Sequence, residues 1–193
     1  PMTLDPFDNE RFKASPTRFH AVVTHVASGK AEYALIEDAF DQMEVLRASS
    51  ALPFVSKMIQ LDASPDLTGG AYLDGGISDS IPVHYARQLD VDKLIVVLTR
   101  PASYRKATRS NPLYSIVYRR FPALVQALNQ RGYHYNQTLD QIETMEAQGE
   151  LFVLRPSAHL EVGRFERDIR VLDSLYNLGR QDGQNQINPL EIY

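Results

Sequence analysis

Five consecutive apolar residues at 94–98, Leu-Ile-Val-Val-Leu, limit the fold of this chain more than any other segment. An unbroken run of this length predicts a strand buried on both faces, the usual environment of a strand in a parallel sheet. Further strands are predicted at 19–26, 32–36 and 151–154, and helices at 38–49, 82–89, 112–129, 137–148 and 165–181. The first two strands would pair across a turn at 28–30. Strands that alternate with helices predict an α/β layer fold.

Composition narrows the class of protein and of site. A chain of 193 residues with 44% hydrophobic content can bury a sizeable core. It has no cysteine, which excludes disulfides, thiolate zinc sites and a cysteine nucleophile. Its five histidines show no metal-ligand spacing, so we predict no metal and no cofactor. No apolar run reaches the length of a membrane span, and the lack of cysteine suits a reducing cytoplasm, where we expect the protein.

The segment Tyr72–Val83 is the strongest functional candidate. It reads as a short strand ending at Asp74, a turn at Gly75-Gly76 and a helix that begins at Pro82. In the structural interpretation, the glycines supply positive φ angles for the turn and Asp74 makes a local Asx-type hydrogen bond. In the functional interpretation, Asp74 is a general base at a strand end. Asp79 is predicted to cap the following helix rather than to act in catalysis.

Several segments in this order resemble the bacterial branch of the patatin-like phospholipase family. The segments are 19–24 followed by 28–30, Arg47-Ala-Ser-Ser-Ala-Leu-Pro-Phe54, 72–83, 93–106, then Arg131, Tyr135 and Asn136, and finally 151–156. The resemblance covers roughly residues 7–182. It implies a three-layer fold with a mostly parallel central sheet. It also implies a division into part of the hydrolase core at 1–100 and a C-terminal extension at 101–193 that packs on the core.

The resemblance further implies a serine–aspartate dyad, with Asp74 as the base and Gly75 and Gly76 supporting the motif. The serine of this family lies in a Gly-x-Ser-x-Gly elbow, which the 193 residues do not contain. We therefore expect the chain to be the C-terminal portion of a lipid acyl hydrolase, lacking the nucleophile and the oxyanion loop and inactive alone. The alternative is a non-catalytic binding or regulatory module of the same fold. An incomplete sheet would also favour self-association or a complementing N-terminal segment.

Positive charge is concentrated in one stretch. Residues 100–139 carry seven lysine and arginine side chains and no acidic residue, although the whole chain has a net charge of −4. Aromatic residues are interleaved, so the stretch could contact an anionic lipid surface. The residues proposed for that contact are Arg105, Lys106, Arg109, Arg119 and Arg120. The alternative is that these charges only solvate a helical face. No recognition motif indicates nucleic acid, and we predict lipid or another ester as the substrate.

Overall fold

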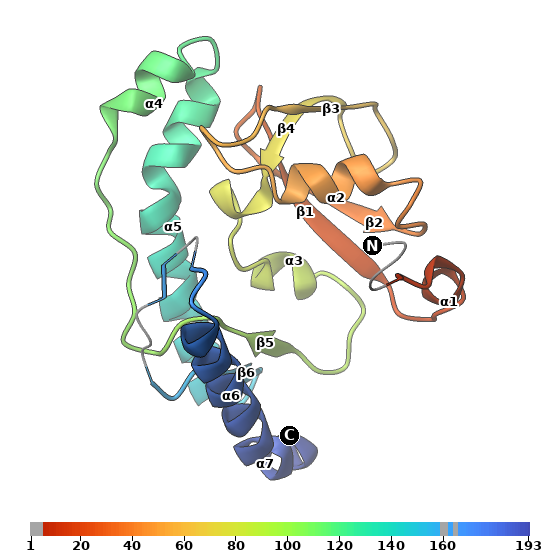
Figure 1. Ribbon diagram of the computed structural model, residues 1–193, viewed down its shortest axis with the longest axis vertical. Helices are drawn as coiled ribbons and strands as arrows, with labels where there is room; N and C mark the ends of the chain where they lie inside the picture. The colour runs from red at the N-terminus through yellow and green to blue at the C-terminus, as the bar shows by residue number, and fades with distance from the viewer. Residues whose placement is uncertain (1–5, 159–161, 164–165) are drawn as a thin grey trace. The chain divides into compact units, whose positions relative to one another are not determined.

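The computed structural model describes residues 6–158, 162–163 and 166–193, which form two compact units (Figure 1). Unit 1 comprises residues 6–82 and 107–135, and unit 2 comprises 83–106 and 136–193. The units interleave along the chain, whereas the resemblance implied a linear division at residue 100. That division stays a prediction about the domains of the protein.

Unit 1 is built on a four-stranded antiparallel sheet with the order β2-β1-β4-β3. The strands are β1 (Phe19–His25), β2 (Ala31–Ile36), β3 (Ile59–Leu61) and β4 (Gly70–Asp74). The predicted β1–β2 hairpin is confirmed, with Val22 opposite Tyr33. Its turn is tight because Gly29 has a φ of +67° and its backbone comes close to the Ala123 carbonyl oxygen. A short connection of this kind can join only antiparallel neighbours.

Most helices of unit 1 begin at a side-chain cap or a proline, whereas the helix at Met43–Ser49 has neither at its start. They are α1 (Asn9–Lys13), α2 (Met43–Ser49), the short 3₁₀ helix η1 (Gly75–Ile77), α4 (Pro112–Val117) and the first half of α5 (Pro122–Ala147). The Asn111 side chain accepts a hydrogen bond from the Leu113 amide and so caps α4. Pro122 interrupts the single helix predicted at 112–129, because the residue before a proline disfavours helical geometry. In contrast, α5 runs without a break through the predicted gap at 130–136.

Two clusters of buried side chains form the core of unit 1. One lies between the sheet and α2 and includes Val23, Ala48 and Tyr72. The other joins the sheet and η1 to α5 through Leu73, Ile77 and Leu124, which have at most 2% of their surface exposed. Burial of apolar surface from segments far apart in sequence is what holds the strand end at residue 74 in place.

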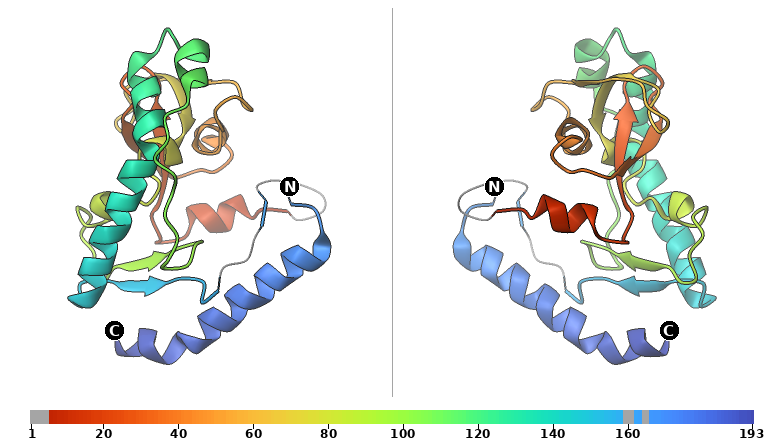
Figure 2. Two further views of the ribbon diagram at one scale, coloured as in Figure 1. Left: turned by 90° about the vertical axis from the view of Figure 1, so that its left-hand side faces the viewer. Right: turned by 90° about the vertical axis from the view of Figure 1, so that its right-hand side faces the viewer.

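Unit 2 contains a parallel strand pair and several helices. The strands are β5 (Ile95–Val97) and β6 (Phe152–Leu154), which lie side by side (Figure 2). The helices are α3 (Val83–Ala86), the second half of α5, α6 (Ile169–Asn185) and α7 (Ile187–Ile192). Asp168 caps α6 by accepting from the Arg170 amide, and the helix runs through Gly183 to Asn185, beyond the end predicted at residue 181. Residue 165, the predicted start, lies outside the described residues.

The α/β class predicted from the sequence is confirmed, but two finer predictions are wrong. The larger sheet is antiparallel rather than mostly parallel, since each of its three neighbouring strand pairs, β2–β1, β1–β4 and β4–β3, is antiparallel. The apolar strand β5 is buried on only one face: Val96 is 7% exposed, whereas Val97 is 70% exposed. The three-layer arrangement stays a prediction.

In the part of the chain that the structure describes, no helix has the length and apolar character needed to cross a membrane.

Candidate functional site

The backbone of Asp74 is fixed at the end of β4. The residue pairs with Val23 of β1, and its amide donates a hydrogen bond of 3.0 Å to the Ala51 carbonyl. Its own carbonyl accepts a hydrogen bond of 2.8 Å from the Thr24 hydroxyl. Thr24 is fully buried, so the Asp74 backbone is held from within the core. The Asp74 side chain therefore extends from a backbone that is fixed by these hydrogen bonds.

The Asp74 carboxylate closes the turn that follows the strand. Its Oδ1 accepts a hydrogen bond of 2.7 Å from the Gly76 amide, which caps η1 and confirms the predicted Asx-type contact. Within the described residues, Oδ2 accepts no hydrogen bond. One oxygen thus orients the carboxylate while the other remains able to accept a proton.

The role predicted for the two glycines is wrong in its geometry. Neither Gly75 nor Gly76 has a positive φ. Gly75 is needed for close approach, because a Cβ there would lie 2.2 Å from the Val22 carbonyl oxygen. A Cβ at Gly76 would lie 3.0 Å from Asp74 Oδ1 and crowd the carboxylate. The glycines therefore serve the packing of the site rather than an unusual turn conformation.

Arg131 of α5 contacts the same turn, a contact that was not predicted from the sequence. Its Nε donates a hydrogen bond of 2.6 Å to the Gly76 carbonyl. It extends the inward-facing row of Leu124 and Leu128, both buried, by one further turn of the helix. A charged side chain in an otherwise apolar row was the signal that could have identified it. Arg131 ties the turn to α5 and places a positive charge beside it.

Ser78 and Thr24 form a second polar contact behind the turn, at 2.7 Å between the two hydroxyl oxygens. The Thr24 proton is donated to the Asp74 carbonyl, so the Ser78 hydroxyl must donate to Thr24. This pair connects η1 to β1 at the position where Asp74 leaves the sheet. It was not predicted, because the contact joins residues far apart in sequence.

A cavity of about 440 Å³ opens beside the Ser78 side of the turn. Its walls come from the β1–β2 turn, η1 and the first half of α5. The lining residues are Ser28, Gly29, Lys30, Ala31, Tyr33, Ile77, Ser78, Ala123, Gln126, Ala127, Gln130 and His134. Mixed polar and apolar walls of this kind can hold a small molecule that has both characters.

Asp79 has a different role from the helix cap that was predicted. Its Oδ2 accepts a hydrogen bond of 2.7 Å from the Tyr33 hydroxyl on β2. The neighbouring Ser80 donates to the Gly76 carbonyl at 2.7 Å. Asp79 therefore stabilises the loop after η1 by a tertiary contact with the sheet.

Tyr72, a buried residue of β4, makes a further set of polar contacts. The Tyr72 hydroxyl donates a 2.6 Å hydrogen bond to Glu32 Oε2 and accepts one of 3.0 Å from the Gly69 amide. Burial, with the Glu32 carboxylate close by, raises the pKa of Tyr72 to about 12. His25 Nδ1 lies 3.8 Å from the same glutamate. This cluster fixes β4 at Tyr72, two residues before Asp74.

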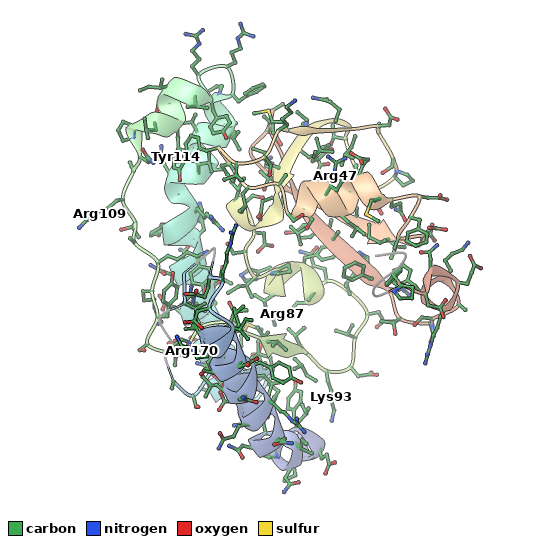
Figure 3. The ribbon with its side chains drawn as sticks, in the orientation of Figure 1. Arg47, Arg87, Lys93, Arg109, Tyr114 and Arg170 are labelled. Carbon is green, nitrogen blue, oxygen red and sulfur yellow. The ribbon has the colours of Figure 1, made fainter. Side chains whose placement is uncertain are left out.

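The basic residues proposed for lipid contact lie in different environments. Arg105 pairs with Asp140 and Glu143, each at 3.0 Å. Arg109, Arg119 and Arg120 are exposed, and the Arg109 side chain extends away from the chain in Figure 3. The backbone of Lys106 exchanges two hydrogen bonds with the Asn136 amide group. Contact of any of them with lipid stays a prediction.

Among the described residues there is no group of three metal-binding side chains.

The fold and the turn can now be compared with known protein families. Residues 6–87 match the family described as Patatin-like phospholipase, which supports a lipid hydrolase family for this part of the chain. The Asp74-Gly75-Gly76 turn lies inside the matched segment. Residues 121–193, which include all of α5, α6 and α7, match a domain of unknown function, DUF6363.

A curated relative shares one short segment with this chain. It is the uncharacterized protein YjjU of Escherichia coli (strain K12), 42% identical over 60 residues. The match covers 31% of the chain and 15% of the relative. The shared segment is therefore a small part of a much longer protein.

Proposed function

We propose that this chain supplies the aspartate of a serine–aspartate lipid acyl hydrolase, with Asp74 as the general base. The observation that carries the proposal is the carboxylate itself: Oδ1 is held by the Gly76 amide at the end of β4. It lies in the segment that matches a lipid hydrolase family. A base must be held in one orientation and keep an oxygen for the proton it removes, and Asp74 meets both requirements.

In the proposed mechanism, Asp74 acts twice. Its free oxygen takes the serine proton as the serine oxygen attacks the ester carbonyl, and the proton passes to the leaving alcohol. The acyl-serine is then hydrolysed by a water molecule that Asp74 deprotonates. Arg131 acts as a positioning residue, because it holds the Gly76 carbonyl on the turn that orients the carboxylate. The serine is proposed to come from a segment outside these 193 residues, since they contain no Gly-x-Ser-x-Gly elbow.

The test compares two carboxylate variants in a longer protein that contains this chain and a nucleophile elbow. Asp74→Asn should lower kcat by roughly 10²–10⁴, the range expected for loss of a general base. Asp79→Asn is the matched control, because it also removes one carboxylate from the same loop and should keep turnover within a few-fold. An active Asp74→Asn enzyme beside an inactive Asp79→Asn enzyme would refute the assignment.

The alternative function is a non-catalytic binding or regulatory module of the same fold. The two proposals differ in what the chain does alone and with a complementing segment. Alone, it should hydrolyse p-nitrophenyl esters no faster than a buffer blank, because the nucleophile and the oxyanion donors are not in it. Activity that returns when an elbow-bearing segment is added, and that depends on Asp74, supports the hydrolase. A lipid ligand that binds without any such recovery supports the module.

A further inference from the structure

Unit 1 exposes a cluster of apolar side chains on α4 and on the loop after α2. We name it the α4 patch: Phe54, Val55, Leu113, Ile116 and Val117, each between 49% and 67% exposed. On α4, the spacing of Leu113, Ile116 and Val117 places them on one side of the helix. Such a concentration of exposed apolar side chains on one short helix and one loop usually marks an interaction surface.

The loop residue of the patch is held in a strained conformation. Phe54 is the one non-glycine residue with a positive φ, +67°, in the described part of the chain. Its ring stacks on Tyr114 with 5.3 Å between centroids, and its amide donates a hydrogen bond of 2.8 Å to the Tyr118 hydroxyl. Backbone strain of this kind is unfavourable for a residue with a side chain and persists only where the surroundings enforce it. Here Tyr114 and Tyr118 contact Phe54 and keep its aromatic ring at the surface.

The two segments that form the α4 patch carry only positive charges. These segments, 47–61 and 100–139, contain no aspartate or glutamate. Exposed Arg119 and Arg120 follow α4 directly, Arg109 precedes it, and Lys57 follows the loop residue Val55. Within the described residues, none of these four side chains forms a salt bridge, in contrast to Arg105. Their charges therefore remain available to an anionic surface.

We propose that the α4 patch docks unit 1 on an anionic lipid bilayer. An apolar helix face beside several uncompensated cations is the arrangement by which interfacial helices bind membranes, with apolar side chains among the acyl chains and cations at the headgroups. A protein partner would equally need an acidic surface, but the choice of lipid rests on the proposed lipid hydrolase function. Docking at this position brings the unit that carries Asp74 to the surface where an ester substrate resides.

The first experiment measures binding of the chain to vesicles, with no hydrolysis required. We expect cosedimentation with vesicles of equal parts phosphatidylcholine and phosphatidylglycerol, weaker binding at high salt, and little binding to phosphatidylcholine alone. The double variant Arg119→Ala, Arg120→Ala should bind the anionic vesicles at least about tenfold more weakly, because each cation contributes about fivefold. The matched control, Arg11→Ala with Arg18→Ala, also removes two exposed arginines of unit 1 and should bind as the wild type does. Equal losses in the two double variants would overturn the proposal.

The second experiment locates the contact. The chain contains no tryptophan, so Ile116→Trp would carry the sole indole group. Its fluorescence should shift to the blue when anionic vesicles are added, whereas that of Val91→Trp, at another exposed apolar position, should not. Vesicle binding with no shift at Ile116→Trp would overturn the proposal. A shift that grows with protein concentration in the absence of vesicles would also overturn it, because a second copy would then cover the patch. Either failure leaves the Asp74 proposal intact, since the kinetic test does not depend on these residues.

Discussion

The strands of unit 1 and unit 2 differ in how far their side chains are buried. Unit 1 closes two clusters in which Val23, Tyr72 and Leu73 have no exposed surface. Unit 2 leaves Ile95 and Val97 of β5 exposed, together with much of the apolar surface of α6. The difference shows that unit 1 holds its strand ends by its own packing, whereas the β5 face of unit 2 is suited to further contacts. The candidate base lies in the unit with the closed core.

The sharpest test of this contrast places a methyl group on a glycine in each unit. Gly75→Ala should destabilise unit 1 by about 4 kcal/mol or more, because the new Cβ would meet the backbone of β1 and nothing there can yield. Gly179→Ala in α6 meets no atom within 4 Å outside its own helix, and should stabilise that helix by roughly 0.5–1 kcal/mol. Urea denaturation followed by circular dichroism measures both. Similar, small effects in the two variants would show that the close approach of Gly75 to β1 does not contribute to the stability of unit 1.

A second prediction concerns the buried hydroxyl in unit 1. The folded-state pKa of Tyr72 is about 12, above its ordinary value of 10.0, so folding favours the neutral phenol. Its stabilising contribution is complete below pH 10 and is lost as the pH rises through 12. Tyr72→Phe should lower the free energy of unfolding at neutral pH by about 1.5–3 kcal/mol, since Glu32 loses a charge-assisted hydrogen bond. The variant should also lose this part of the alkaline destabilisation, which melts across the alkaline range would reveal. Identical pH profiles for the two proteins would contradict the assignment.

A smaller effect is expected at Asp79. Asp79→Asn keeps an oxygen that can accept from the Tyr33 hydroxyl and removes only the charge. The expected loss is at most about 1 kcal/mol, the difference between a charged and a neutral acceptor. Thermal melts of this variant beside Tyr33→Phe would test it. A much larger loss for Asp79→Asn than for Tyr33→Phe would show that the carboxylate has another partner.

The smallest effect on stability is expected on the exposed face of β5. Val97→Lys should change the free energy of unfolding by less than about 0.5 kcal/mol, because the side chain is 70% exposed. We propose that this face favours self-association or contact with a complementing segment, so the same variant should reduce the association seen by light scattering. A wild-type chain that is monodisperse and monomeric would contradict that proposal.

The elements that the sequence predicted well depend on neighbours in the chain. The β1–β2 hairpin follows from two short strands around a glycine turn, and the end of β4 at Asp74 follows from the glycines behind it. The Asx-type hydrogen bond of Asp74 is likewise local. These features were accessible because each is decided within a few residues.

The features that the sequence did not predict depend on residues far apart. The contact of Arg131 with Gly76 spans more than fifty positions, and the Thr24–Ser78 pair is of the same kind. The apolar pattern of β5 predicted burial on both faces, but burial is decided by what packs on a strand and not by the strand itself. The positive φ of Phe54 in the α4 patch was not predictable for the same reason, since the residue is held by a hydrogen bond to Tyr118 on another segment.

The order in which the chain is synthesised gives the interleaving of the two units a further consequence. The second cluster of unit 1 needs Tyr118, Leu124 and Leu128, which leave a ribosome long after Val26 and Leu73, their partners in the sheet. The face of the sheet that carries Leu73 therefore lacks these partners while residues 83–106 are synthesised. During that interval the nascent chain presents the apolar surface that chaperones recognise. Burial of the Leu73 side of β4 therefore depends on side chains of Ala107–Tyr135, which are translated only after residues 83–106.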